Sequence, residues 1–438
     1  MTQEWISEFN PASEEQWKSQ LLKELKGDSE KLQVQNELEE LNYSTFYHPD
    51  SQKNQALNSD SLPIARGFQK STNQWRNGIQ ITIKDEKGAN RKALDALMKG
   101  CDFIHFISTR ATNWQQTLDG IGLAFIHTTF SLVEPNDLRE LMALLGKEKM
   151  HHCSFSFTKN DLTNNEIKDL IKESQLPIIQ IDGFYINQCG ANAIQELAFV
   201  LVQAHSSLVQ LLELGLSIDE AAACIHFRLG VGFNYLVEIA KFRAVKLLWA
   251  NILKQYSPVH KCSYNCQITA EIGWVNKSLK DPNTNLLRQT TEAMSAILGG
   301  IDRLIIHPFD ACSLDGSSEF TERIALNISN LLQDESYFSA VADPLGGSYA
   351  IESLTEEISV QGWNLFKQMD ALPEEIQKLK WKELVENKAK QRIGFLRSSK
   401  SILVGINKFM SPAKENSNWA KANTFENMNF LRLETEIQ

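Results

Sequence analysis

The sequence has no run of eighteen apolar residues, so it predicts no transmembrane helix. It also has no long run of lysine or arginine, and its formal net charge is −10 at pH 7, which argues against nucleic acid or an anionic membrane as a partner. The first residues, MTQEWISEFNPASEEQW, are acidic and lack the apolar core of a signal peptide. The seven cysteines are scattered, which is typical of reduced thiols. We therefore expect a cytoplasmic protein.

Several common site motifs are also missing. The sequence has no Gly-x-Ser-x-Gly and no phosphate-binding loop. Gly230 and Gly232 follow a predicted strand, but the third glycine of a dinucleotide-binding fingerprint is absent. His260, Cys262 and Cys266 lack the paired spacing of a structural zinc site. We therefore expect this chain to bind no metal and no nucleotide cofactor.

What the sequence does contain is a repeating pattern that begins at Gly78. With 438 residues, 42% of them hydrophobic and 22% charged, the chain suits one large domain with appendages or two domains. Short β-rich runs alternate with helical segments. The predicted strands are 79–83, 103–108, 124–130, 154–158, 177–181, 224–229, 266–270 and 304–308, and the predicted helices are 91–99, 114–120, 137–147, 165–175, 191–215, 237–256, 286–298 and 319–332. Eight strands, each followed by a helix, predict an α/β fold, a (β/α)8 TIM barrel.

Other segments flank the barrel, which we place at residues 62–340. Residues 1–61 form an N-terminal arm, in which Ser13 to Gln16 resembles a capping box that opens a helix. Trp17, Leu21 and Leu25 give this helix an apolar stripe, which packs either on the chain's own body or on another subunit. Residues 341–410 are expected to form a C-terminal helical extension. Residues 411–438 are polar, and we expect a poorly ordered tail.

The chain is organised around the stretch from Leu176 to His205. An apolar run ends at a turn, Asp182-Gly183, and a polar segment and a long apolar helix follow. In barrel enzymes the segment just past a strand carries chemistry. Here that segment reads Phe-Tyr-Ile-Asn-Gln and has no ordinary acid, base or nucleophile. The sequence therefore predicts the position of an active site without its catalytic residues.

The predicted helix 237–256 needs only a structural explanation. Ile239, Phe242 and neighbouring apolar residues form a stripe along one face. We expect Glu238, Lys241 and Lys246 to face away from this stripe.

Four segments stand out, at residues 238–249, 285–300, 343–349 and 404–409. Together they resemble the methylmalonyl-CoA mutase family of adenosylcobalamin-dependent acyl-CoA mutases. Residues 238–249 are similar to the family's EIAKFRA…LW helix, and residues 285–300 to its NLLR, TTEA and GG segment. Residues 343–349 match its DP-GGSY turn, and residues 404–409 its VGVNKF strand. The resemblance spans roughly residues 70–410 and implies a (β/α)8 substrate barrel, which agrees with the strand count.

Departures from the family's motifs affect the expected site. The family's GYHMQEAGA segment aligns with residues 183–191, so that Tyr185 stands where the resemblance places a catalytic histidine. Cys224 stands at the substrate-binding arginine of its PRLSFF strand, and residues 64–68 lack the tyrosine of its RPYAGF segment. The resemblance retains only the glutamine of HCQTSG, as Gln267. We therefore expect degenerate catalytic positions at Tyr185 and Cys224, with Gln267 as the candidate substrate contact.

The resemblance also implies which part would bind the cofactor. The family's catalytic subunit has a cobalamin-binding domain with an Asp-x-His-x-x-Gly motif, which does not occur in this sequence. We expect no cobalamin-binding domain here, and adenosylcobalamin in a partner chain, the large (alpha) subunit of a heterodimer. This chain would be the non-catalytic small (beta) subunit that supports the interconversion of (R)-methylmalonyl-CoA and succinyl-CoA.

Two other functions remain open. The chain could be the barrel subunit of a split acyl-CoA mutase, although such a barrel should retain the catalytic histidine and tyrosine. It could also be a regulatory module that binds a CoA ester through Gln267 and the nearby Arg66 and Arg228. If the chain is inactive, we expect Phe184, Tyr185 and Phe233 to fill the barrel centre.

Overall fold

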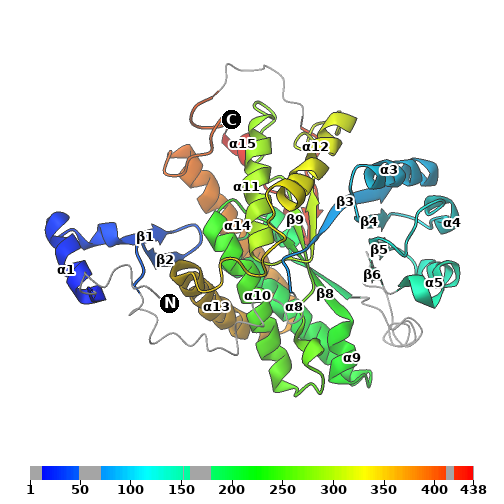
Figure 1. The fold of residues 1–438 in the computed structure, drawn as a ribbon, viewed down its shortest axis with the longest axis horizontal. Coiled ribbons are helices and arrows are strands. Elements are labelled where there is room, and N and C mark those ends of the chain that lie inside the picture. Colours follow the sequence, from blue (N-terminus) through cyan, green and yellow to red (C-terminus); the bar gives the residue numbers. More distant parts are fainter. Residues whose placement is uncertain (1–11, 49–70, 151, 158–178, 411–418, 438) are drawn as a thin grey trace, which may run out of the picture.

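The computed structural model describes residues 12–48, 71–150, 152–157, 179–410 and 419–437. Its centre is a parallel sheet of eight strands in the order β6-β5-β4-β3-β10-β9-β8-β7 (Figure 1). The strands are β3 Arg76–Ile83, β4 Phe103–Ser108, β5 His127–Leu132, β6 Cys153–Phe157, β7 Ile179–Asp182, β8 Ile225–Gly230, β9 Ile268–Ile272 and β10 Arg303–Ile306. The end strands β6 and β7 lie close together without a ladder between their described residues, so the barrel is nearly closed.

Helices cover the outside of this barrel (Figure 1). They are α3 Glu86–Met98, α4 Trp114–Thr117, α5 Pro135–Met150, α8 Ala193–Glu213, α9 Ile218–Ala223, α10 Tyr235–Gln255, α11 Thr284–Leu298 and α12 Glu319–Asn330, with a short α7, Phe184–Gln188, after β7. Short 3-10 helices lie at Ser29–Leu32 and Lys261–Tyr264, and a short π-helix lies at Leu331–Glu335. The predicted TIM-barrel fold is confirmed. The predicted helix 165–175 lies outside the described residues.

Side chains alternate between the two faces of each strand, and this alternation separates apolar from polar residues. Phe106, Phe130 and Phe155 of three neighbouring strands stack on one another, with ring centroids 5.9 and 5.4 Å apart, and Trp114 of α4 packs edge-on against Phe130. The core therefore lies between the sheet and its helices. The residues next in sequence, such as His105, point to the barrel interior.

The N-terminal arm has two differently packed parts. The helix α1, Glu14–Glu24, begins at the predicted capping box, has no buried residue, and stands away from the barrel in Figure 1. Its Trp17 stacks on Phe46 at 3.9 Å. The hairpin of β1 Gln33–Asn36 and β2 Leu41–Ser44 instead docks on this chain, because the carboxylate of Glu39 accepts the Ala193 N–H at 2.9 Å and pairs with Arg392 at 3.0 Å.

Two long helices, α13 Tyr349–Asp370 and α14 Glu374–Arg397, form the C-terminal extension. The buried Arg243 of α10 fixes it to the barrel by ion pairs to Asp343 and Glu352. Among the described residues, no helix is both long and apolar enough to cross a membrane.

The prediction of a poorly ordered tail is wrong for residues 419–437. This segment contains β11 Thr424–Phe425, β12 Met428–Asn429 and α15 Leu433–Ile437. Four of its apolar side chains are buried: Met428, Phe430, Leu431 and Leu433. Because apolar burial contributes about 25 cal/mol per Å2, a short cluster such as this can hold a segment whose overall composition is polar.

Candidate functional site at the carboxyl ends of the strands

The interior of the barrel is polar near the carboxyl ends of its strands. Arg228 of β8 donates to the amide oxygen of Gln80 of β3 at 3.0 Å, and these strands are not neighbours in the sheet. The bond therefore crosses the interior. His105 adds a hydrogen bond to Ser131 at 2.7 Å. TIM-barrel interiors are more commonly filled by branched apolar residues.

Arg228 is the centre of this interior network. Its guanidinium makes a two-bond contact with Glu271, at 2.7 and 2.8 Å, and a third bond to Asp182 at 2.7 Å. Glu271 also bonds the imidazole of His307 at 2.6 Å. Arg228 and Glu271 are almost completely buried, at 1% and 0% exposure. The network thus draws its members from β3, β7, β8 and β9 and from the residue after β10.

Arg228 and Glu271 hold each other in the ionised form, whereas burial raises the pKa of Asp182. Burial raises the pKa of Glu271, but Arg228 and His307 outweigh burial and keep that pKa well below its usual value. Burial alone would lower the pKa of Arg228, but Asp182 and Glu271 raise it well above its usual range. A general acid or base needs a pKa near the working pH. The geometry and the directions of these pKa shifts therefore fit a structural ion pair of Arg228 and Glu271.

Two aromatic rings cover Arg228. The guanidinium carbon lies 4.5 Å from the ring centre of Phe184 and 4.8 Å from that of Tyr185, both within cation–π range. Phe184 is buried, as expected, whereas Phe233 is 41% exposed and does not fill the barrel. The prediction of a filled centre is therefore wrong about Phe233, and it missed the ionic network. A signal was present in the sequence, because polar residues recur at every second position of β8 and β9.

A second buried ionic cluster lies beside the end of β8. The ammonium of Lys241 contacts Glu196 at 2.8 Å, Glu238 at 2.6 Å and the carbonyl oxygen of Gly230 at 2.8 Å. Glu196 also accepts the Gly230 N–H at 2.7 Å. Glu238, Lys241 and Lys246, which we expected away from the packed face of α10, are all buried. That expectation is wrong about burial, because α10 is enclosed by its neighbours on nearly every side.

The Glu196 cluster predicts a dependence of stability on pH. Burial raises the pKa of Glu196 from 4.5 to about 7, although Lys241 opposes the rise. The folded chain then binds a proton that the unfolded chain has released, so this group's contribution to stability is complete below pH 4.5 and is lost as the pH rises to about 7. The free energy of unfolding, measured with urea, should therefore change less steeply with pH between these values in Glu196→Gln than in the natural chain. The difference in slope should correspond to up to about one proton. An unchanged slope would contradict the assignment.

The predicted site residues lie at opposite ends of the barrel. Tyr185 lies on α7, just past the carboxyl end of β7. Cys224 and Gln267 come directly before β8 and β9, at the amino ends of those strands, and burial raises the pKa of the Cys224 thiol to about 12. The structure therefore does not bring Tyr185 together with the other two. Residues 64–68, including Arg66, lie outside the described residues.

Gln267 lines a hollow at the amino ends of the strands. Its side-chain oxygen accepts a hydrogen bond from Arg303 at 3.2 Å, and His127 and Asp302 line the same space of about 470 Å3. Gln267, the position that the resemblance retains, therefore borders open space at this end of the barrel.

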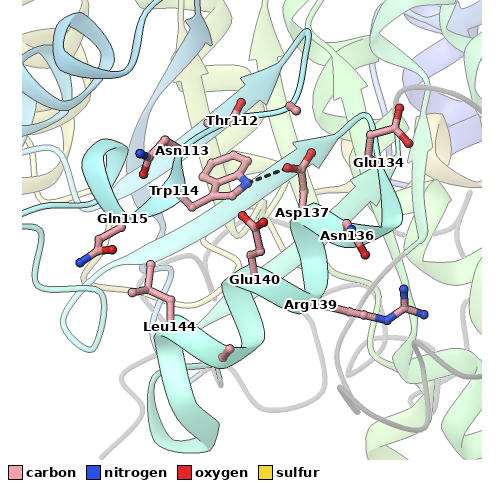
Figure 2. Close-up of a pocket in the computed structure, with 12 residues that line it drawn as sticks. Thr112, Asn113, Trp114, Gln115, Glu134, Asn136, Asp137, Arg139, Glu140 and Leu144 are labelled. Carbon is pink, nitrogen blue, oxygen red and sulfur yellow. Dashed lines mark hydrogen bonds between the residues drawn. The ribbon is translucent and has the colours of Figure 1, made fainter.

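A larger hollow, of about 1080 Å3, lies on the outer helical layer between α4 and α5 (Figure 2). Figure 2 shows Trp114 directed toward Asp137, which accepts its indole N–H at 3.2 Å, whereas Arg139 points away. This hollow is not at the ends of the strands, so it is not part of the candidate site.

The described residues do not fit a cobalamin cofactor at the carboxyl ends of the strands. A histidine that coordinates cobalt would need a free ring nitrogen, and the Nε2 atom of His307 is instead bonded to Glu271. Residues 419–437 also lie over this mouth, where Phe425 and Phe430 pack on Tyr185 with ring centroids 5.5 and 5.8 Å away. Within the described ranges, no group of three or more histidine, cysteine, aspartate or glutamate side chains is placed to hold a metal ion.

The fold and the position of this site define a parallel α/β barrel of the kind found in metabolic enzymes, with a site face at the carboxyl ends of its strands. A family model described as Methylmalonyl-CoA mutase matches residues 169–435, which is more than half of the chain. The chain therefore belongs to the methylmalonyl-CoA mutase family.

Individual relatives agree with this assignment. The chain is 32% identical to the methylmalonyl-CoA mutase small subunit of Porphyromonas gingivalis over 392 residues, which cover 82% of this chain and 63% of that protein. It is 34% identical to the methylmalonyl-CoA mutase of Rhizobium meliloti over 53% of this chain and 33% of the relative. It is 35% identical to the mitochondrial enzyme of Bos taurus over 54% of this chain and 32% of the relative. The chain thus spans less than two thirds of the length of each.

Proposed function

We propose that this chain is the non-catalytic small (beta) subunit of an adenosylcobalamin-dependent methylmalonyl-CoA mutase. It would form a cytoplasmic heterodimer with a large (alpha) subunit that holds the cofactor and isomerises (R)-methylmalonyl-CoA and succinyl-CoA. One observation supports this most directly: the interior at the carboxyl ends of the strands is occupied by the Arg228 network, in which Glu271 and Asp182 are already paired. The substitutions at Tyr185 and Cys224 point the same way.

The partner is inferred from the arm and from a relative. One similar protein is described as a small subunit, which implies a larger companion. The helix α1 of this chain has no buried residue, although Trp17, Leu21 and Leu25 are apolar. We assign the first part of the arm, within residues 1–61, to docking on that companion. Two further aromatic residues of the arm, Trp5 and Phe9, lie outside the described residues.

The isolated chain should show no mutase activity. With adenosylcobalamin and methylmalonyl-CoA, purified chain should give no succinyl-CoA above a no-protein control, since loss of one preorganised donor to a developing oxyanion typically costs about 2.7–4 kcal/mol. The large subunit, purified alone and with this chain, is the positive control. Steady turnover by the isolated chain would contradict the proposal.

A second candidate function rests on the hollow beside Gln267. A CoA-ester-binding regulatory module would need open space next to a retained substrate contact, and the hollow of about 470 Å3 provides it. Titration of the isolated chain with methylmalonyl-CoA distinguishes a regulatory module from a purely structural subunit. Saturable binding that is lost in Gln267→Ala favours the regulatory module, and no binding favours a purely structural subunit.

A further inference from the structure

Residues 419–437, which we call the strap, contact the carboxyl-end mouth of the barrel as a bound peptide would. The strap's backbone is held at two points, because the Leu431 N–H donates to the Gln188 carbonyl at 2.7 Å and the Leu433 N–H donates to the Val275 carbonyl at 3.0 Å. Gln188 ends α7 and Val275 follows β9. The strap therefore joins two elements at the mouth of the barrel.

Its apolar side chains fill the surface between those elements. Phe425 and Phe430 pack on Tyr185, and Phe425 also lies 6.2 Å from the ring centre of Phe199 on α8. A Cβ atom on Gly190 would approach Leu431 to 3.0 Å, and Gly190 has a φ of +105°. A side chain at position 190 would therefore be strained by the backbone and crowded by the strap.

The buried carboxylate of Glu434 in the strap is bound by a separate group of hydrogen-bond donors. The carboxylate of Glu434, 1% exposed, accepts the Ser278 hydroxyl at 2.5 Å and the backbone N–H groups of Leu279 and Lys280 at 3.0 and 3.2 Å. The indole N–H of Trp419, within the strap, is a further donor at 3.0 Å. Three donors that converge from residues 278–280 form a site shaped for one carboxylate, and hydrogen bonds to a charged group are stronger than those between neutral groups.

We propose that the mouth of the barrel is a peptide-binding site, that this chain occupies it in cis with residues 419–437, and that Glu434 is the main recognition residue. The ligand class is a short peptide in which an aromatic and two leucines precede a glutamate, as in Phe430-Leu431-Arg432-Leu433-Glu434. The contacts of Glu434 with residues 278–280 join positions 154 to 156 residues apart. The strap thus resembles a ligand held at high effective concentration by its tether. This inference does not depend on the proposed function.

The test separates the strap from its site. A chain ending at Met410 is titrated with a synthetic peptide of residues 411–438, labelled for fluorescence anisotropy. The peptide should bind saturably. A Glu434→Gln peptide should bind at least about tenfold more weakly, because the neutral amide loses the charge-assisted bonds. The matched control is Glu436→Gln, since Glu436 is exposed, and it should bind as the natural peptide does. Equal affinity of all three peptides, or no binding to a folded truncated chain, would overturn the proposal.

A second measurement tests the proposal if the truncated chain does not fold. Full-length Glu434→Gln is then compared with the natural chain by hydrogen exchange. The Leu431 and Leu433 amides should exchange faster while the strands β8 and β9 keep their protection. Protection lost throughout the chain, or unchanged at the strap, would show that the strap is part of the core and not a bound peptide.

Discussion

Replacing Arg228 with methionine should lower the free energy of unfolding by about 3–5 kcal/mol, since removing one partner of a buried ion pair leaves the other charge unpaired in the interior. The charges left behind are Glu271, which is fully buried, and Asp182. Urea denaturation followed by circular dichroism measures the loss. The doubly substituted chain, Arg228→Met with Glu271→Gln, should recover part of it, because the second change removes one of the unpaired charges.

The matched control is Arg76→Met. Arg76 also pairs with an aspartate, Asp102, at 2.8 Å, but its side chain is 44% exposed. Exposed pairs contribute at most about 1 kcal/mol. If Arg228→Met costs no more than Arg76→Met, the interior network does not stabilise the barrel and our description of it as a structural ion pair is wrong.

The strand pattern of the barrel could be predicted from the sequence because each β-rich run and each helical segment is recognised from neighbouring residues alone. The predicted strand 103–108 matches β4, and the other seven predicted strands overlap those observed. The start of the predicted strand at 124–130 was wrong by three residues. The Phe125 N–H bonds to the Gly122 carbonyl in a turn, and this takes residues 124–126 out of the ladder despite their apolar character. Strand existence was therefore predicted better than strand boundaries.

The contents of the barrel interior could not be predicted in the same way. Arg228 contacts Gln80, Asp182 and Glu271, which are 148, 46 and 43 positions away in the chain. A charged residue in a strand could equally face solvent, and only the closed arrangement of strands decides that it is buried. The same holds for the buried Lys241, whose ion-pair partner Glu196 lies on another helix, α8.

The strap was missed for a different physical reason. Its sequence alternates polar with apolar residues over too few positions to give a helical or strand period, and its average composition is polar. Its order comes from surfaces built by α7 and by the segment after β9. Only a fold prediction that already placed those surfaces could have found it.

Deleting residues Met1–Lys31 should abolish co-purification with the proposed large subunit while leaving the barrel folded. The deletion removes α1, which has no buried residue, and ends before the β1–β2 hairpin, whose Glu39 is fixed to Arg392 and Ala193. The chain's own core is therefore untouched. An obligate interface typically exceeds about 2,000 Å2, and aromatics such as Trp17 carry much of its energy.

Two point variants distinguish docking from local packing. Trp17→Ala should weaken co-purification without changing the circular dichroism spectrum. Lys18→Ala, on the same helix, should change neither co-purification nor the spectrum. If the truncated chain binds the large subunit as tightly as the full chain does, α1 serves only to stack on Phe46. If the truncation unfolds the barrel, then the deleted residues stabilise the fold of this chain itself. The interface would then lie on another face.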